Sequence, residues 1–444
     1  MNPFRLHNSG FPAARKKGRY ARFAALLATT LALAGACAPP AVEAQHGSGG
    51  VNAERWLDAP CVVLVSFDAF RWDYPDRGLT PNLDRLARRG ARADALIPMF
   101  PTKTFANHYS IATGLSPGHN GLVANNFYDP AFDATYRLGD RSTVEDGRWY
   151  GGEPIWVTAE MQGMVTAAMF FVGTEAPVKG IQPTYWNKFD DAVTEDTRIR
   201  TVLDWLAMPA AERPHLITLY FERLDNAGHR YGPDSPELGL ALAGADSLVG
   251  RLMDGIDALP WHDRVSLVVL TDHGMSPLDK PPVVLEDWAD LDSVRVMTAG
   301  PLAQLYVRGD TARARALKNA LDRAPGMTAY LPDETPAAWR TGRNPRFGDV
   351  LLVADEGVQI RRRDQTGERS PATHGWPPIR SMYGVFFAAG PRIRAGTRVP
   401  AFENINVYPL LAELLGLDPA TGIDGSLDVL RPILTGTGPD TGRR

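Results

Sequence analysis

The 444-residue sequence contains only two cysteines, Cys37 and Cys61. If Cys37 leaves with an N-terminal signal, no disulfide can form within the chain. An exported protein of this kind then depends on its hydrophobic core or on bound metals, and its size permits that. Cys61 begins an apolar, valine-rich run, which is typical of a buried small side chain and not of a reactive thiol.

The sequence also lacks a strong net charge. It has 47 basic and 51 acidic residues, a formal net charge of −4. Nothing in this balance indicates a nucleic-acid duplex as a partner. Nucleotides and other small phosphates stay compatible, because a metal or a helix N-terminus can meet their charge locally.

Long apolar stretches are confined to the N-terminus. Residues 1–22 carry six Arg or Lys and no acid, and the apolar run 23–36 follows. This is the pattern of a secretory signal, and the run is short for a membrane span. We expect cleavage after Ala44 and export to the periplasm or the medium, with no membrane span in the mature form. A lipid anchor at Cys37 is the alternative, and a permanent N-terminal anchor is a further one.

After residue 52, apolar runs typical of buried strands alternate with amphipathic segments typical of helices. This alternation predicts an α/β fold with a mostly parallel central sheet flanked by helices. Strands are expected within 61–70, 166–173, 215–225, 265–274 and 383–390. Helices are expected within 79–90, where Thr80 is the predicted cap, 195–208, 235–259, where Ser235 is the predicted cap, and 406–417.

Residues 276–372 differ from this pattern because they are proline-rich and mix strand-like with helical segments. We interpret them as a smaller α+β subdomain, or cap, inserted into the core. The predicted organisation is therefore a signal peptide (1–44), a flexible leader (45–52), a first core part (53–275), the insertion (276–372), a second core part (373–434) and a flexible tail (435–444).

Three of the predicted strands end in acid, at Asp68, Asp225 and Asp272. The carboxyl ends of parallel strands meet at one edge of a sheet, where such carboxylates repel one another unless a cation lies between them. Three histidines accompany them: His229, His273 and His374. Carboxylate oxygen and imidazole nitrogen without cysteine indicate a catalytic zinc site. A single Asp or His of this kind is more often a cap or a loop residue, but five of them at the predicted ends of three strands are much less common by chance.

The string "PTKTFANHYSIATG", residues 101–114, places a threonine hydroxyl at the expected start of a helix. Exposed N–H groups and the helix dipole favour an alkoxide and a phosphate there. A threonine needs a base or a metal to act as a nucleophile, and the sequence shows no Ser-His-Asp spacing or nucleophile elbow. Metal activation is the simpler account; the alternative is that Thr102 or Thr104 only caps the helix.

The chain resembles the nucleotide pyrophosphatase/phosphodiesterase family of the alkaline phosphatase superfamily, in its bacterial type. The strings that carry the resemblance span about residues 60–416 and are "VSFDAFRWDY", "FPTKTFANHYSIATGLSPGHNGLVANNFYDP", "YFERLDNAGHRYGP", "TDHGM", "THGW" and "NVYPLLAELLGL". The nucleophile string and the D-x-x-x-H-x-Y-G-P string are the most specific. Two positions depart from the family pattern, Ala106 and Leu224, where relatives usually have proline.

The resemblance implies Thr104 as the nucleophile and two zinc ions as cofactors. One zinc is expected on Asp68, Thr104, Asp272 and His273, and the other on Asp225, His229 and His374. Asn125 and the backbone N–H of Phe105 are expected to bind a phosphate oxygen. The implied reaction cuts a nucleotide phosphodiester or pyrophosphate bond at the α-phosphate, through a covalent phosphothreonine, and releases a nucleoside 5′-monophosphate.

Three aromatic residues are the candidates for binding the substrate's base: Phe105, Phe189 and Trp186. Stacking on such rings is worth about 1–3 kcal/mol per base and tolerates any base. Aromatic rings also bind quaternary ammonium groups. A choline or lipid head-group phosphodiesterase, or a phosphonate hydrolase on the same scaffold, is therefore the alternative. A non-catalytic binding protein is a further one.

Overall fold

The structure is a computed structural model that describes residues 45–46 and 50–436. The predicted signal peptide, its cleavage point at Ala44, the alternative anchor at Cys37 and most of the tail lie outside the described residues. Gln45–His46 forms a short strand, β1, at the edge of the main sheet, within the segment predicted as a leader. No helix in the described part of the chain is long and apolar enough to cross a membrane.

The core of the protein is a nine-stranded sheet in the order β1-β8-β7-β9-β2-β10-β19-β3-β20. Its centre is parallel, and antiparallel pairs occur only where β1 meets β8 and where β19 meets β10 and β3. The prediction of a mostly parallel sheet is thus confirmed. The strands are β7 (Thr166–Met169), β8 (Tyr185–Trp186), β9 (Leu216–Phe221), β2 (Cys61–Phe67), β10 (Val265–Leu270), β19 (Phe386–Ala389), β3 (Ala91–Ala93) and β20 (Thr397–Val399).

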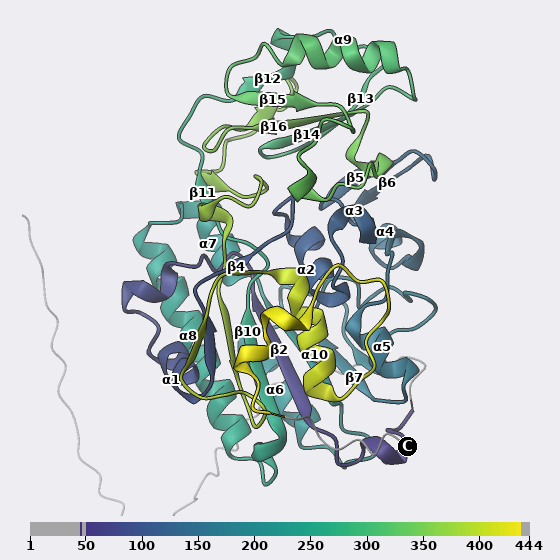
Figure 1. The fold of residues 1–444 in the computed structure, drawn as a ribbon. Helices are drawn as coiled ribbons and strands as arrows, with labels where there is room; N and C mark the ends of the chain where they lie inside the picture. The colour runs from purple at the N-terminus through teal and green to yellow at the C-terminus, as the bar shows by residue number, and fades with distance from the viewer. Residues whose placement is uncertain (1–44, 47–49, 437–444) are drawn as a thin grey trace, which may run out of the picture. The chain divides into compact units, whose positions relative to one another are not determined.

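Alternation along β2 shows how the sheet is covered. Val62 and Leu64 face one hydrophobic cluster, whereas Val63 and Val65 face the other, because successive strand side chains point to opposite faces. The first cluster contains α2 (Thr104–Thr113), α5 (Ile155–Met161) and α10 (Val407–Leu415); the second contains α1 (Pro81–Arg89), α6 (Glu195–Leu206) and α8 (Pro236–Asp257). Helices therefore cover both faces of the sheet (Figure 1).

One of the two predicted helix caps is confirmed. The Ser235 hydroxyl accepts a hydrogen bond from the first turn of α8. Thr80 does not cap α1, because its hydroxyl donates to a backbone carbonyl instead. The carboxylate of Asp246 takes the role from another helix, accepting the N–H groups of Asn82 and Leu83 at 3.1 and 2.8 Å. A tertiary contact has replaced the local cap.

The predicted third strand is shorter than expected. β9 ends at Phe221, opposite Phe67, the last residue of its neighbour β2. Beyond that point the chain has no strand to pair with, and it turns into α7 (Arg223–Tyr231). The sequence predicted that Asp225 ends a strand, but it lies in the first turn of a helix. His229 follows one helical turn later, on the same face.

Residues 276–372 contain a second, antiparallel sheet in the order β13-β14-β16-β15, packed against α9 (Thr311–Leu321). Its strands are β13 (Arg295–Ala299), β14 (Leu302–Tyr306), β16 (Val350–Ala354) and β15 (Met327–Tyr330). Where the segment leaves and rejoins the core, β11 (Ser276–Pro277) pairs with β18 (Ala372–Thr373). The content is α+β, as expected for an insertion; its boundaries stay a prediction.

Burial in the central sheet predicts a large effect of Leu64→Ala. Leu64 is fully buried in β2 between paired strands, so truncation leaves a cavity and should reduce the free energy of unfolding by about 2–5 kcal/mol. Leu240→Ala is the matched control, because this side chain is 76 % exposed and its loss should change stability by less than about 0.5 kcal/mol. Urea unfolding measures both; equal effects would contradict the assigned core.

Candidate functional site

Three carboxylates meet at the carboxyl edge of the parallel strands. Asp68 follows β2 directly, Asp272 lies two residues beyond β10, and Asp225 lies in α7. Each has one buried oxygen that accepts no hydrogen bond from any described residue: Asp68 Oδ1, Asp225 Oδ1 and Asp272 Oδ2. Buried carboxylate oxygens are normally hydrogen-bonded, so three unpaired ones at one place fit a site that binds a cation.

The orphaned oxygens form two groups with the three histidines. In the first group, His273 Nε2 lies 3.0 Å from Asp272 Oδ2, 3.4 Å from Asp68 Oδ1 and 3.2 Å from the Thr104 hydroxyl. In the second group, Asp225 Oδ1 lies 3.3 Å from His229 Nε2 and 3.8 Å from His374 Nε2. The structure therefore brings together all seven residues that the sequence predicted as metal ligands.

The ring orientation of these histidines suits metal binding. Each Nδ1 lies within hydrogen-bonding distance of a backbone carbonyl: His229 with Ala372 at 3.0 Å, His273 with Gly274 at 2.9 Å and His374 with Thr102 at 2.8 Å. A carbonyl accepts only, so Nδ1 carries the proton and Nε2 presents a lone pair. The rings are thus held in the tautomer that binds a metal through Nε2.

Electrostatics point the same way. Burial, with the charge of Asp225, raises the pKa of Asp272 to about 8, and burial with the charge of Asp272 raises the pKa of Asp68. Burial also lowers the pKa of His273 and of His374, which favours neutral imidazoles. These oxygen and nitrogen donors, with no sulfur, can hold divalent metal ions of the zinc type.

The two threonines near the start of α2, Thr102 and Thr104, have different roles. Thr102 is fully buried, and its hydroxyl donates to Trp376 O at 2.8 Å and accepts from Gly375 N at 3.0 Å. Thr104 is the first residue of α2, and the helix has no side-chain cap. The alternative, in which the Thr104 hydroxyl only caps the helix, is therefore wrong. The hydroxyl instead faces His273 and the carboxylates around it.

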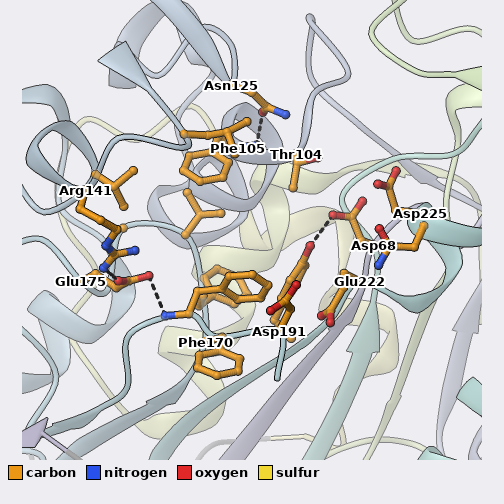
Figure 2. Close-up of a pocket in the computed structure, with 18 residues that line it drawn as sticks. Asp68, Thr104, Phe105, Asn125, Arg141, Phe170, Glu175, Asp191, Glu222 and Asp225 are labelled. Atoms are coloured by element: carbon orange, nitrogen blue, oxygen red, sulfur yellow. Dashed lines mark hydrogen bonds and ion pairs between the residues drawn. The ribbon is translucent and has the colours of Figure 1, made fainter. Parts of the chain in front are cut away.

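The phosphate-binding groups differ in part from those expected. The N–H of Phe105 donates to Asn125 Oδ1 at 2.9 Å, so this predicted oxyanion donor is already engaged. The side-chain nitrogen of Asn125, Nδ2, points away from that bond (Figure 2). Within residues 50–436 the Thr104 N–H, first in the helix, makes no hydrogen bond. The donors left for a phosphate oxygen are thus Asn125 Nδ2 and the Thr104 N–H.

A cavity of about 360 Å³ opens beside Thr104. Figure 2 shows Phe105 on one wall and Phe170 on the opposite one, with the ion pair of Arg141 and Glu175 at the far end. Of the described residues, 18 line the cavity, and its apolar members are Phe105, Leu138, Val144, Phe170, Phe171, Val172 and Phe189. Phe189 is 42 % exposed, so a planar ligand can reach its ring.

Trp186, the other predicted base contact, is not among the cavity's residues. It lies in β8 and is buried, with its neighbour Ala168 in β7. The sequence placed it near the site because Phe189 follows three residues later, but the strand ends at Trp186 and the chain then turns toward the cavity. The structure therefore corrects this assignment.

Sequence reasoning missed two residues that support the site. The Tyr220 hydroxyl donates to Asp68 Oδ2 at 2.7 Å, which leaves the other oxygen of Asp68 for a cation. His108, one turn beyond Thr104 in α2, lies 2.8 Å from the Ser66 hydroxyl and 3.4 Å from Asp272. The only sequence signals were the hydroxyl of Tyr220 near the end of a mostly apolar strand and the position of His108 one turn beyond Thr104.

Sheet, helices and site together define an α/β protein with the alkaline-phosphatase-like fold. The chain belongs to the type I phosphodiesterase/nucleotide pyrophosphatase family, whose family model matches residues 62–377. The family resemblance inferred from the sequence is thereby confirmed.

Among curated relatives, a venom phosphodiesterase of Crotalus durissus collilineatus is 34 % identical over 398 residues, which cover 86 % of this chain and 48 % of the relative. Human ectonucleotide pyrophosphatase/phosphodiesterase family member 1 is 34 % identical over 397 residues, 85 % of this chain and 43 % of the relative. The chain thus spans about half the length of these relatives.

The fold is also similar to solved structures. One is the inactive threonine-to-alanine variant of murine ectonucleotide pyrophosphatase/phosphodiesterase 5 in complex with AMP, with a TM-score of 0.80 and 28 % identity. The match covers 85 % of this chain and 100 % of that one. The human counterpart matches with a TM-score of 0.79 and the same identity.

The raised pKa of Asp272 predicts how the metal-free protein responds to pH. Above about pH 6.5 the unfolded chain has released the protons of its carboxyl groups and histidines, whereas folded Asp272, with a pKa of about 8, keeps its proton. Unfolding free energy should therefore fall as pH rises from about 6.5 to about 8; at lower pH the lowered pKa values of His273 and His374 act in the opposite direction. The slope is about 1.4 kcal/mol per pH unit for this group alone. Urea unfolding of chelated protein across that window measures it.

Two controls accompany this measurement. Asp272→Asn removes the titrating group at nearly constant shape and should flatten the slope. Added zinc should reverse the trend, because metals bind the deprotonated carboxylates more tightly as pH rises. Stability of the metal-free protein that stays level or increases between about pH 6.5 and 8 would contradict the burial of an unpaired Asp272 carboxyl group.

Proposed function

We propose that the protein hydrolyses phosphodiester or pyrophosphate bonds of nucleotides at the α-phosphate and releases a nucleoside 5′-monophosphate. The observation that carries the proposal is the Thr104 hydroxyl. It lies 3.2 Å from His273 Nε2, beside three orphaned carboxylate oxygens and at the inner end of an aromatic cavity. Relatives described as phosphodiesterases, and the AMP complex of a similar fold, support it.

The cofactors in this proposal are two zinc ions. One is assigned to Asp68, Thr104, Asp272 and His273, and the other to Asp225, His229 and His374, following the two groups of donor atoms. When bound, the zinc pair supplies positive charge that favours the alkoxide of Thr104 and offsets the charge of the phosphate and the leaving oxygen.

The chain's own residues account for the remaining steps. Thr104 Oγ forms a bond to phosphorus while the bond from phosphorus to the leaving oxygen breaks, which gives a phosphothreonine. Asn125 Nδ2 and the Thr104 N–H donate to a non-bridging oxygen, and the N-terminus of α2 favours the negative charge. Water then attacks phosphorus and breaks the bond to Thr104, which restores the hydroxyl.

The substrate preference follows from the cavity. Phe105 and Phe189 both line it, and Phe189 is held at the back by the rings of Phe170 and Tyr220 at 5.2 and 6.1 Å. A nucleobase stacked in this slot reaches toward the Arg141–Glu175 pair, while its phosphate reaches Thr104. The two ends thus suit a nucleoside monophosphate group.

Bacterial type, periplasmic or secreted location and the signal peptide stay predictions. The relatives reported above are snake and mammalian proteins. Venom enzymes and ectoenzymes are consistent with an exported protein.

A substrate panel tests the proposal directly. Zinc-loaded enzyme should hydrolyse p-nitrophenyl thymidine 5′-monophosphate faster than p-nitrophenyl phosphate or p-nitrophenyl phosphorylcholine, and a chelator should stop it. Thr104→Ala should lower turnover by at least roughly a thousandfold because it removes the nucleophile. Thr104→Ser keeps a hydroxyl and should retain measurable turnover.

Other outcomes of the panel have definite meanings. A preference for the choline ester would move the substrate to head groups and leave the mechanism in place. No turnover of any ester by protein that binds two zinc ions would favour phosphonates or a non-catalytic binding protein.

The aromatic slot predicts a selective effect of Phe189→Ala. Loss of one stacking ring should raise KM for the thymidine ester by roughly 5- to 150-fold, the equivalent of about 1–3 kcal/mol. Hydrolysis of bis(p-nitrophenyl) phosphate, which has no base, should change less. Trp186→Phe, outside the cavity, is the control and should leave KM unaltered. An equal change of KM in both variants would contradict a stacking role for Phe189.

A further inference from the structure

Two residues that line the cavity are carried by one hairpin. It consists of β5 (Asn126–Asp129) and β6 (Ala134–Arg137), with Asn125 and Leu138 at its open end. The Leu138 N–H donates to Asn125 O at 3.0 Å, so the two residues are joined. Both line the cavity. The place of the hairpin therefore sets where the phosphate donor of Asn125 and the apolar wall of Leu138 stand.

The insertion holds this hairpin through one buried arginine. Arg346, in the short helix η7 (Pro345–Phe347), is 9 % exposed, and its Nε donates to Asp129 Oδ2 at 2.6 Å. Its Nη1 donates to Gly121 O at 2.7 Å and to Trp149 O at 2.9 Å. A buried ion pair with these extra hydrogen bonds is rigid, and removal of one partner leaves the other charge buried without a counter-ion.

Asp129 passes this contact on to the hairpin turn. Its second oxygen, Oδ1, accepts the N–H groups of Ala131 at 2.7 Å and Phe132 at 3.2 Å. One carboxylate thus orders the turn and joins it to the insertion. Because Asp129 is the last residue of β5, the ion pair also fixes the strand that begins next to Asn125.

A row of aromatic rings continues from Arg346 to the nucleophile. The guanidinium lies 5.3 Å from the ring centre of Phe127, which stacks on Tyr136 at 5.1 Å. Tyr136 then meets the edge of Phe105 at 6.1 Å, and Phe105 follows Thr104 in the chain. If the arginine is displaced, the packed rings of Phe127, Tyr136 and Phe105 should therefore shift in turn, up to the cavity wall.

The insertion contacts the same hairpin a second time. The Arg295 guanidinium of β13 lies 3.8 Å from the ring centre of Tyr128, and Tyr306 of β14 meets that ring at 5.1 Å. The Tyr306 hydroxyl in turn donates to Arg346 O at 2.6 Å. Figure 1 shows β5 and β6 beside the sheet of the insertion.

From these contacts we infer that Arg346 is a positioning residue for substrate selectivity. It touches no substrate, but it holds the hairpin so that Leu138 completes the nucleoside slot while Asn125 reaches the phosphate. The inference rests on the proposed function and goes beyond it: the insertion, and not the catalytic core alone, makes the enzyme favour nucleoside esters over phosphodiesters that lack a base.

The test is a double-mutant cycle with Arg346→Met, Asp129→Asn and the pair. Each is assayed on p-nitrophenyl thymidine 5′-monophosphate and bis(p-nitrophenyl) phosphate. Arg346→Met should raise KM for the nucleoside ester by at least about tenfold and lower the ratio of the two kcat/KM values. The double variant should lose less than the sum of the single ones, because both act through one contact.

A matched control separates this contact from docking of the insertion in general. Arg340 also joins the insertion to the core, through Glu403 at 2.9 Å, and among the described residues it makes no hydrogen bond or ion pair with the hairpin. Arg340→Met should leave the substrate ratio within about twofold. An equal loss in this variant, or an unaltered ratio in folded Arg346 variants, would overturn the inference.

Two further measurements keep the outcome decisive. If Arg346→Met fails to fold, judged by zinc content and melting, Arg346→Lys keeps the charge without the planar fork and should lower the ratio in the same direction. Amide hydrogen exchange should increase across 125–138 and not in β2. A wild type without preference for the nucleoside ester would refute the proposed function, and unaltered exchange would separately refute the role of Arg346.

Discussion

The repulsion among three carboxylates, of which Asp68 and Asp272 are buried and Asp225 is half-buried, is the constraint on which the site depends. Asp68, Asp225 and Asp272 each turn one unpaired oxygen toward the lone pair of a histidine Nε2, at distances of 3.0 to 3.8 Å. Acceptors facing acceptors at this range are unfavourable unless a cation lies between them. The parallel sheet brings these groups to one edge, and surrounding bonds to Tyr220 and to backbone carbonyls keep them from turning away.

Much of this could be predicted from the sequence because two strong signals coincide. Bare apolar runs such as Cys61–Phe67 mark strands buried on both faces, and polar residues at their ends fall at the ligand edge by the geometry of parallel sheets. The strand order gathers the acids without any need to know side-chain contacts in advance. The same logic brought His273 to the site, whereas His374, beyond the insertion and before the last core strand, was assigned through the family resemblance.

What the sequence could not predict depends on contacts between distant segments. The sequence predicts Thr80 as the cap of α1, but Asp246 from another helix accepts the first N–H groups instead. Asp225 looks like a strand end, yet the strand stops where its partner stops. Arg346 carries no local pattern at all, since its importance lies in Asp129, more than two hundred residues earlier. Such roles follow from tertiary packing, which the periodicity of a sequence does not reveal.

The β11–β18 ladder has a consequence for how the family's chain lengths can vary. Ser276 pairs with Thr373, so the insertion departs and returns at neighbouring points. The rings of His273 and His374, just outside that ladder, stack with centres 3.6 Å apart. The two segments that carry His273 and His374 are therefore already held together at the base of the insertion. Residues added or lost near α9, at its far end, change the reach of the insertion and leave the spacing of these two histidines untouched.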